Sequence, residues 1–125
     1  MHIILVEDDS IGSEIVGAAL VQDGMQVTSV ADGAEAIALL DEGVCPDLLL
    51  TDIRLPGEWD GWLVARIYQD EWPDLPVIYI SAKQPTTDRV DNSIYLCKPV
   101  SLVLLLQAVK ALAGPRLRRV GGRRH

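Results

Sequence analysis

Residues 48–57 read LLLTDIRLPG, and this stretch decides the fold class. The apolar run Leu48–Thr51 has the length and composition of a buried strand, and Asp52 follows it directly. The Pro-Gly pair at residues 56–57 is typical of a turn. A carboxylate between a buried strand and a turn should lie at the open end of a β-sheet, where a ligand can reach it.

Two other apolar runs also end in charged residues. His2–Val6 runs into Glu7 and Asp8, and Ile94–Cys97 runs into Lys98. Parallel strands place their carboxyl ends at one edge of a sheet, so we expect these groups to share a site with the acid described above. Acids and a lysine at one edge suggest a site for a cation and a phosphoryl group.

Apolar runs alternate with segments of helical period, which predicts an α/β fold with one parallel sheet covered by helices on both faces. The predicted strands are His2–Val6, Gln26–Val30, Leu48–Thr51, Val77–Ile80 and Ile94–Cys97. The predicted helices are Ser10–Gln22, Ala34–Glu42, Gly61–Glu71, a short fourth one within Thr86–Asn92, and a last one from Ser101 to a stop at Gly114. The first should bury Ile11, Ile15, Ala18 and Ala19, and the last should bury Leu102, Leu105, Leu106, Val109 and Leu112.

The fourth helix is expected to be short or disordered, because only sixteen residues separate Ser81 from Lys98. They must hold a loop, a helix and a strand. At 3.6 residues per turn, Thr86–Asn92 supplies at most about two turns.

The length of 125 residues fits one domain, 1–114, followed by a basic tail, 115–125. All eighteen acidic residues lie in 1–114, whereas five of the eleven Lys and Arg residues lie in the tail. An acidic body argues against DNA binding. No apolar run reaches the roughly 20 residues of a membrane span, and no secretory leader is recognisable. Two cysteines without metal-ligand spacing indicate reduced thiols, so we expect a cytoplasmic protein.

The acids suit a hard cation such as Mg²⁺, which prefers oxygen ligands and keeps several waters. Asp8 and Asp52 could ligate directly and Glu7 through water, and a backbone carbonyl near Arg54 could complete the set. Each acid also has a simpler explanation: Asp8-Asp9 and Asp52 could merely cap helices or turns.

A carboxylate can also be a nucleophile towards phosphorus, forming an aspartyl phosphate. In that case Asp52 would be the acceptor, and Lys98 and the hydroxyl of Ser81 would each bind a phosphoryl oxygen. Taken alone, Ser81 could be a turn residue and Lys98 a solvated charge. The grouping of five suitable side chains at strand ends favours the shared site.

The chain resembles the receiver domain of bacterial two-component response regulators over roughly residues 2–113. The order and spacing of the motifs carry the resemblance, whereas each motif alone is weak. The motifs are Leu5-Val6-Glu7-Asp8-Asp9, Ala31-Asp32-Gly33-Ala34-Glu35-Ala36, Pro46-Asp47-Leu48-Leu49-Leu50-Thr51-Asp52, Leu55-Pro56-Gly57, Asp60-Gly61, Ser81-Ala82 and Lys98-Pro99.

The resemblance implies a doubly wound, flavodoxin-like sheet of five parallel strands in the order 2-1-3-4-5, with five helices. It implies that Asp52 accepts a phosphoryl group from a histidine of a partner kinase or phosphotransfer protein. Glu7 and Asp8 would form the Mg²⁺ pocket. Ser81 and Tyr95 would take the switch positions; an ordinary strand tyrosine is the alternative for Tyr95.

This sequence departs from the family pattern in three places. The loop after Asp52 holds one extra residue, with Glu58-Trp59 inserted, and the segment from Ser81 to Lys98 is short. Val100 stands where phenylalanine is frequent. For the inserted Trp59, a loop anchor is favoured over a partner contact. These features resemble a subgroup of stand-alone receivers.

We therefore expect a single-domain response regulator that is not an enzyme beyond assisting its own phosphorylation and dephosphorylation. Its output would be a downstream protein partner, onward phosphotransfer or service as a phosphate sink. A phosphorylation-independent interaction module is one alternative. A Mg²⁺-dependent phosphohydrolase is another, but Arg54 stands where a second acid would be needed.

Overall fold

The computed structural model describes residues 1–82 and 90–118. Five parallel strands form one sheet in the order β2-β1-β3-β4-β5, as predicted. The strands are β1 (His2–Val6), β2 (Gln26–Val30), β3 (Leu48–Asp52), β4 (Val77–Ser81) and β5 (Ser93–Cys97). The helices in the described part of the chain are α1 (Ser10–Gln22), α2 (Gly33–Asp41), α3 (Gly61–Glu71) and α4 (Leu102–Arg118).

Helix α4 is therefore the helix that was predicted from the sequence as the fifth. The predicted short helix within Thr86–Asn92 falls largely on residues 83–89, which lie outside the described residues. Across the described ranges, no helix combines the length and the apolar character that crossing a membrane requires.

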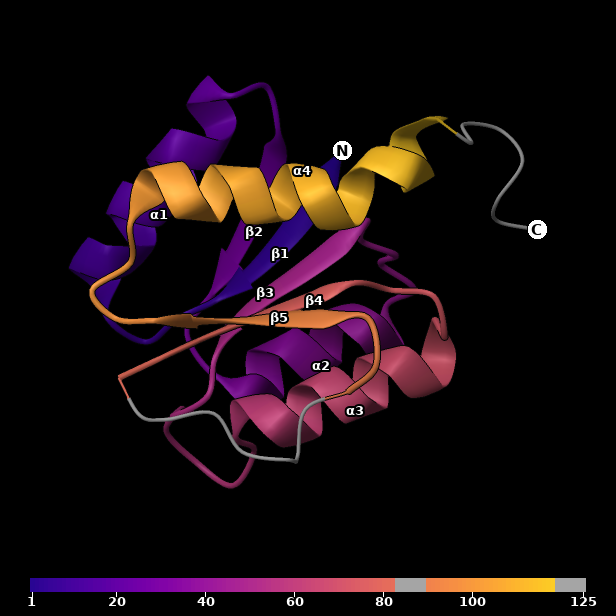
Figure 1. The fold of residues 1–125 in the computed structure, drawn as a ribbon. Coiled ribbons are helices and arrows are strands. Elements are labelled where there is room, and N and C mark those ends of the chain that lie inside the picture. Colours follow the sequence, from indigo (N-terminus) through magenta and orange to yellow (C-terminus); the bar gives the residue numbers. More distant parts are fainter. Residues whose placement is uncertain (83–89, 119–125) are drawn as a thin grey trace.

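Helices cover both faces of the sheet: α1 and α4 lie on one face, and α2 and α3 lie on the other (Figure 1). Alternate residues of each strand point to opposite faces, so the central strands supply two separate clusters of apolar side chains. Every residue of β3 and β4 is buried. This burial on both faces explains why the sequence of β3 is a continuous apolar run rather than an alternating one.

Two strands extend one residue further than predicted at their carboxyl ends. Asp52 is the last residue of β3, and Ser81 is the last residue of β4. Both polar side chains therefore belong to the sheet rather than to the loops that follow it.

The prediction for the buried face of α1 was wrong. Ile11 and Ile15 are 68% and 53% exposed, and the buried residues are Val16 and Leu20. Apolar residues occur on nearly every side of this helix, so the sequence pattern could not select the face that packs on the sheet.

The last helix also differs from its prediction. Leu105 and Val109 are buried as expected, but Leu102 is 36% exposed. The helix continues past Gly114 to Arg118, so the predicted stop at that residue was wrong. A single glycine costs a helix only about 1 kcal/mol relative to alanine, which is too little to end a helix by itself. The separate basic tail, 115–125, stays a prediction.

Candidate functional site

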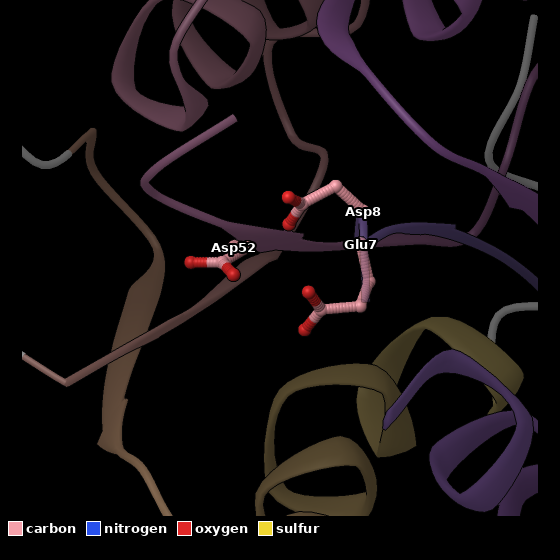
Figure 2. A group of neighbouring side chains, drawn as sticks. All are labelled: Glu7, Asp8 and Asp52. Atoms are coloured by element: carbon pink, nitrogen blue, oxygen red, sulfur yellow. The ribbon is translucent and has the colours of Figure 1, made fainter. Parts of the chain in front are cut away.

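The carboxyl ends of β1, β3 and β4 bring several predicted residues together. The pairing of β1 with β3 runs to Val6, the last residue of β1, and Asp52 pairs with Ile80 of β4. Glu7 and Asp8 follow β1 directly, so this register places them beside Asp52. Figure 2 shows the three carboxylates, drawn as sticks, turned towards the same space.

These three acids form a compact cluster. One oxygen from each of Glu7, Asp8 and Asp52 lies within 4.8 Å of the other two. Glu7 and Asp52 are only 7% and 5% exposed, whereas Asp8 is exposed to solvent. The backbone N–H of Asp9 donates to Glu7 Oε2 at 3.1 Å, and that of Arg54 donates to Asp52 Oδ1 at 3.2 Å. Backbone groups therefore orient the two buried carboxylates.

Lys98 connects the two buried acids. Its Nζ lies 2.8 Å from Asp52 Oδ2 and 3.2 Å from Glu7 Oε1. Burial lowers the pKa of Lys98, but the hydrogen bonds and negative charges of Asp52 and Glu7 outweigh burial, and the pKa is raised overall. Lys98 is therefore a cation at neutral pH. The pKa of Glu7 is also raised, first by burial and further by the charge of Asp52, against the opposing hydrogen bond from Asp9.

Ser81 lies beside this cluster, whereas Tyr95 lies further along the sheet. Ser81 is buried, and its carbonyl accepts a hydrogen bond from Lys98 N at 2.8 Å. Tyr95 sits in the middle of β5, pairs with Tyr79, and packs on the face that α2 and α3 cover. Its hydroxyl is buried and makes no hydrogen bond with the described residues. The structure thus brings Ser81 to the strand ends but leaves Tyr95 inside the sheet.

The helix-capping alternative applies to Asp9 rather than to Asp8. Asp9 Oδ1 accepts a hydrogen bond from Ile11 N at 3.2 Å and caps α1. Asp8 does not cap this helix and belongs to the acidic cluster instead. Sequence reasoning missed the backbone donors of Asp9 and Arg54, because every residue carries an N–H and residue type gives no signal for where it points.

The acidic cluster fits a hard divalent cation by its donor chemistry. Mg²⁺ in proteins is commonly held by one or two carboxylates and retains several waters. Three carboxylate oxygens, one of them from the exposed Asp8, supply such ligands and leave an open side towards solvent. One lysine balances only part of their charge, so a dication would relieve the remaining repulsion.

The sequence model of the response regulator receiver domain matches residues 3–110. The chain belongs to this family. Receiver domains of two-component systems take a phosphoryl group on an aspartate, bind Mg²⁺ in an acidic pocket, and interact with histidine kinases or phosphotransfer proteins. The family generally serves signalling rather than catalysis.

Curated relatives support this assignment of the receiver domain. The probable transcriptional regulatory protein TcrX of Mycobacterium tuberculosis is 32% identical over 124 residues, covering 95% of this chain and 50% of TcrX. The transcriptional regulatory protein CseB of Streptomyces coelicolor is 34% identical over 125 residues, covering 96% of this chain and 50% of CseB. The receiver domain thus spans about half the length of these relatives.

Solved structures share the fold of this receiver domain. A response regulator receiver protein from Sinorhizobium medicae superposes with a TM-score of 0.88 at 35% identity, covering 93% of this chain and 96% of that one. The receiver domain of the hybrid histidine kinase CckA gives a TM-score of 0.80 at 27% identity, covering 90% of this chain and 99% of that one.

Proposed function

We propose that Asp52 accepts a phosphoryl group from a phosphohistidine of a partner kinase or phosphotransfer protein. The single observation that carries this proposal is the arrangement around Asp52. Asp52 is 5% exposed at the end of β3, and its Oδ2 lies 2.8 Å from Lys98 Nζ. One of its carboxylate oxygens lies within 4.8 Å of an oxygen of Glu7 and of an oxygen of Asp8. Membership of the receiver family supports it.

The chemistry follows from these groups. A carboxylate oxygen of Asp52 attacks phosphorus, the bond from phosphorus to the histidine nitrogen breaks, and its electron pair returns to the imidazole, which takes up a proton. The backbone N–H of Arg54 donates a hydrogen bond to Asp52 Oδ1 and holds the attacking carboxylate in one orientation. Lys98 would exchange its bond to Asp52 for one to a phosphoryl oxygen, and Ser81 would donate its hydroxyl to another.

Glu7, Asp8 and Asp52, with the backbone carbonyl of Arg54, would hold Mg²⁺. The cation would supply positive charge to the phosphoryl oxygens during transfer. The buried hydroxyl of Tyr95, together with Ser81, would carry the resulting charge change into the sheet as a conformational switch. Onward phosphotransfer is the other output of the same adduct.

Metal removal tests the function directly. We expect the purified protein, incubated with acetyl phosphate and MgCl₂, to gain the mass of one phosphoryl group by intact mass spectrometry. With EDTA in place of MgCl₂, the initial rate of labelling should fall by about 100-fold or more, because the charge of the transferring group is then poorly neutralised. Equal rates with and without the chelator would contradict the proposed metal role. A chain that never gains the adduct would favour a phosphorylation-independent interaction module.

The partner would approach over the carboxyl edge of the sheet, next to Lys98. A cavity of about 280 Å³ opens there between α1 and the start of α4, and Glu7, Ile15, Lys98, Pro99 and Leu102 are among its lining residues. Ile11 and Ile15 are largely exposed along the same helix. A phosphohistidine that reaches Asp52 must bring its own helix or loop against this apolar rim, which supplies contact area for a protein donor.

Ile15→Asn tests this docking surface. We expect phosphotransfer from an autophosphorylated histidine kinase that labels the wild type to slow by about 10-fold, because losing an apolar anchor residue of an interface costs more than about 1 kcal/mol. Labelling by acetyl phosphate, which needs no docking surface, should stay unchanged. Val21→Asn is the matched control, since Val21 is 57% exposed at the far end of the same helix. Equal slowing by both variants would contradict the surface.

The acidic body argues against DNA as a partner of this part of the chain. We propose that the exchange takes place in the cytoplasm, because a histidine kinase forms its phosphohistidine from ATP.

A further inference from the structure

The loop between β3 and α3, residues 53–60, closes directly on the acceptor. Gly61 N donates to the carbonyl of Ile53 at 2.8 Å. Gly61 itself lies against the backbone of Asp52, and a Cβ at this glycine would stand 2.2 Å from Asp52 O. Arg54, inside the loop, donates its N–H to the acceptor carboxylate. The loop therefore supplies one of the groups that orient the Asp52 carboxylate.

The other side of the loop rests on the start of α2. Trp59 is half-buried and packs against the apolar cluster of the α2 and α3 face. A Cβ at Gly33, the first residue of α2, would stand 2.4 Å from Trp59 Cβ, 2.7 Å from Trp59 O and 3.1 Å from Val64 Cγ2. Only a glycine permits this approach, and the atoms it faces cannot swing away as a flexible side-chain end could.

Hydrogen bonds also connect the turn that contains Gly33 to Glu7, at the end of β1. Asp32, the N-cap of α2, accepts a hydrogen bond at Oδ1 from Glu35 N at 2.8 Å. Glu35 Oε1 accepts from Ala31 N, one residue before the cap, at 2.7 Å, so the two bonds resemble a capping box displaced by one residue. The preceding residue, Val30, accepts a hydrogen bond from Glu7 N at 3.0 Å. A continuous path of short contacts therefore joins the end of β1 to the loop that follows β3.

We propose that the contact between Gly33 and Trp59 positions the β3–α3 loop relative to Glu7 and Asp8 and thereby sets the affinity of the acidic cluster for Mg²⁺. This inference rests on the proposed function. Mg²⁺ demands ligands at about 2.0–2.1 Å in near-octahedral geometry, so a displacement of a few tenths of an ångström on one side weakens binding. Gly33 and Trp59 are positioning residues, since neither belongs to the acidic cluster itself.

Gly33→Ala tests this arrangement, with Gly17→Ala as the matched control. Gly17 also lies in a helix, but a Cβ there meets only Ser29 Oγ at 4.0 Å, an ordinary contact. In an amide NMR titration with MgCl₂, Gly33→Ala should raise the dissociation constant by about 10-fold, as loss of supporting contacts around metal ligands commonly does. Labelling by acetyl phosphate should need correspondingly more MgCl₂ for half-maximal rate and recover at saturation. Gly17→Ala should match the wild type in both measurements.

A purely structural role would lower the free energy of unfolding without changing the MgCl₂ dissociation constant of the folded molecules. A folded Gly33→Ala variant with wild-type affinity for MgCl₂ would therefore overturn the inference. If Gly33→Ala fails to fold, the pair Trp59→Ala and Trp59→Phe replaces it. Trp59→Ala keeps the Cβ and carbonyl that face Gly33 but removes the ring that holds them there by packing against the apolar cluster of the α2 and α3 face. This variant should bind MgCl₂ about 10-fold more weakly, and Trp59→Phe, which keeps an aromatic ring, should restore binding. Equal affinity in both would also overturn it.

Failure of the proposed function would look different. If the wild type takes no phosphoryl group, Asp52 is not an acceptor. Amide hydrogen exchange of residues 53–61 would still measure how firmly the contact between Gly33 and Trp59 holds the β3–α3 loop. Gly33→Ala should speed exchange of the Arg54 and Gly61 amides by about 10-fold or more relative to Gly17→Ala, through easier local opening. Unchanged exchange at these amides would overturn the inference independently of phosphorylation.

Discussion

The Asp52→Asn variant will take no phosphoryl group from acetyl phosphate under conditions that label the wild type completely. An amide oxygen is a far weaker nucleophile than a carboxylate oxygen, and the substitution also removes one of the three acids in the cluster. We expect the labelling rate to fall by about 10³-fold or more, which places it below detection by intact mass spectrometry.

Asp70→Asn is the control for this substitution. Asp70 is exposed on α3, away from the strand ends, so its variant should be labelled at the wild-type rate. Asparagine at position 52 keeps the shape of the side chain, so a loss of labelling in a folded protein reports chemistry rather than collapse of β3. An adduct that persists in Asp52→Asn would place the phosphoryl group on another residue and contradict the proposed function.

Lys98→Met will slow labelling by acetyl phosphate by about 10² to 10³-fold at saturating MgCl₂. Methionine keeps the apolar stem but removes the ammonium that lies 2.8 Å from Asp52 Oδ2 and 3.2 Å from Glu7 Oε1. A preorganised positive group beside developing phosphoryl charge is commonly worth this much in rate. The measurement is the initial rate of adduct formation across a range of MgCl₂ concentrations.

The concentration series separates two roles of Lys98. If the ammonium acts on the phosphoryl group, added MgCl₂ cannot restore the rate. If it serves only to balance the acids, saturating MgCl₂ should bring Lys98→Met back to the wild-type rate, which would contradict the role proposed above. Lys110→Met is the control, because Lys110 lies on α4 and pairs with Asp23 instead of the acidic cluster.

Much of the site was predictable because it lies at strand ends. Glu7, Asp8, Asp52 and Lys98 each stand just beyond or at the end of an apolar run, and parallel strands in one sheet bring such ends together. The convergence that the sequence predicts is the one that the structure has. The roles of these residues in phosphoryl transfer stay predictions for the experiments above.

Other features of the site carried no sequence signal. The sequence around Lys98 does not predict that its ammonium bridges Glu7 and Asp52. That bridge depends on how far three strands extend relative to one another. The pairing of Trp59 with Gly33 is similarly remote. The sequence identifies the glycine as part of a family motif and the tryptophan as part of an inserted loop, but it does not indicate that the two are neighbours.

The sequence by itself determined the strands, their parallel arrangement, and the acids and lysine at their carboxyl ends. These follow from local periodicity, from burial on both faces of the sheet, and from the family motifs. The tertiary structure alone decided that α1 buries Val16 and Leu20 and leaves Ile11 and Ile15 exposed. It also decided that Gly33 of α2 packs against Trp59 of the β3–α3 loop, next to Asp52. The physical reason is that helix rotation and loop docking are selected by close packing between distant segments, whose contacts no local pattern encodes.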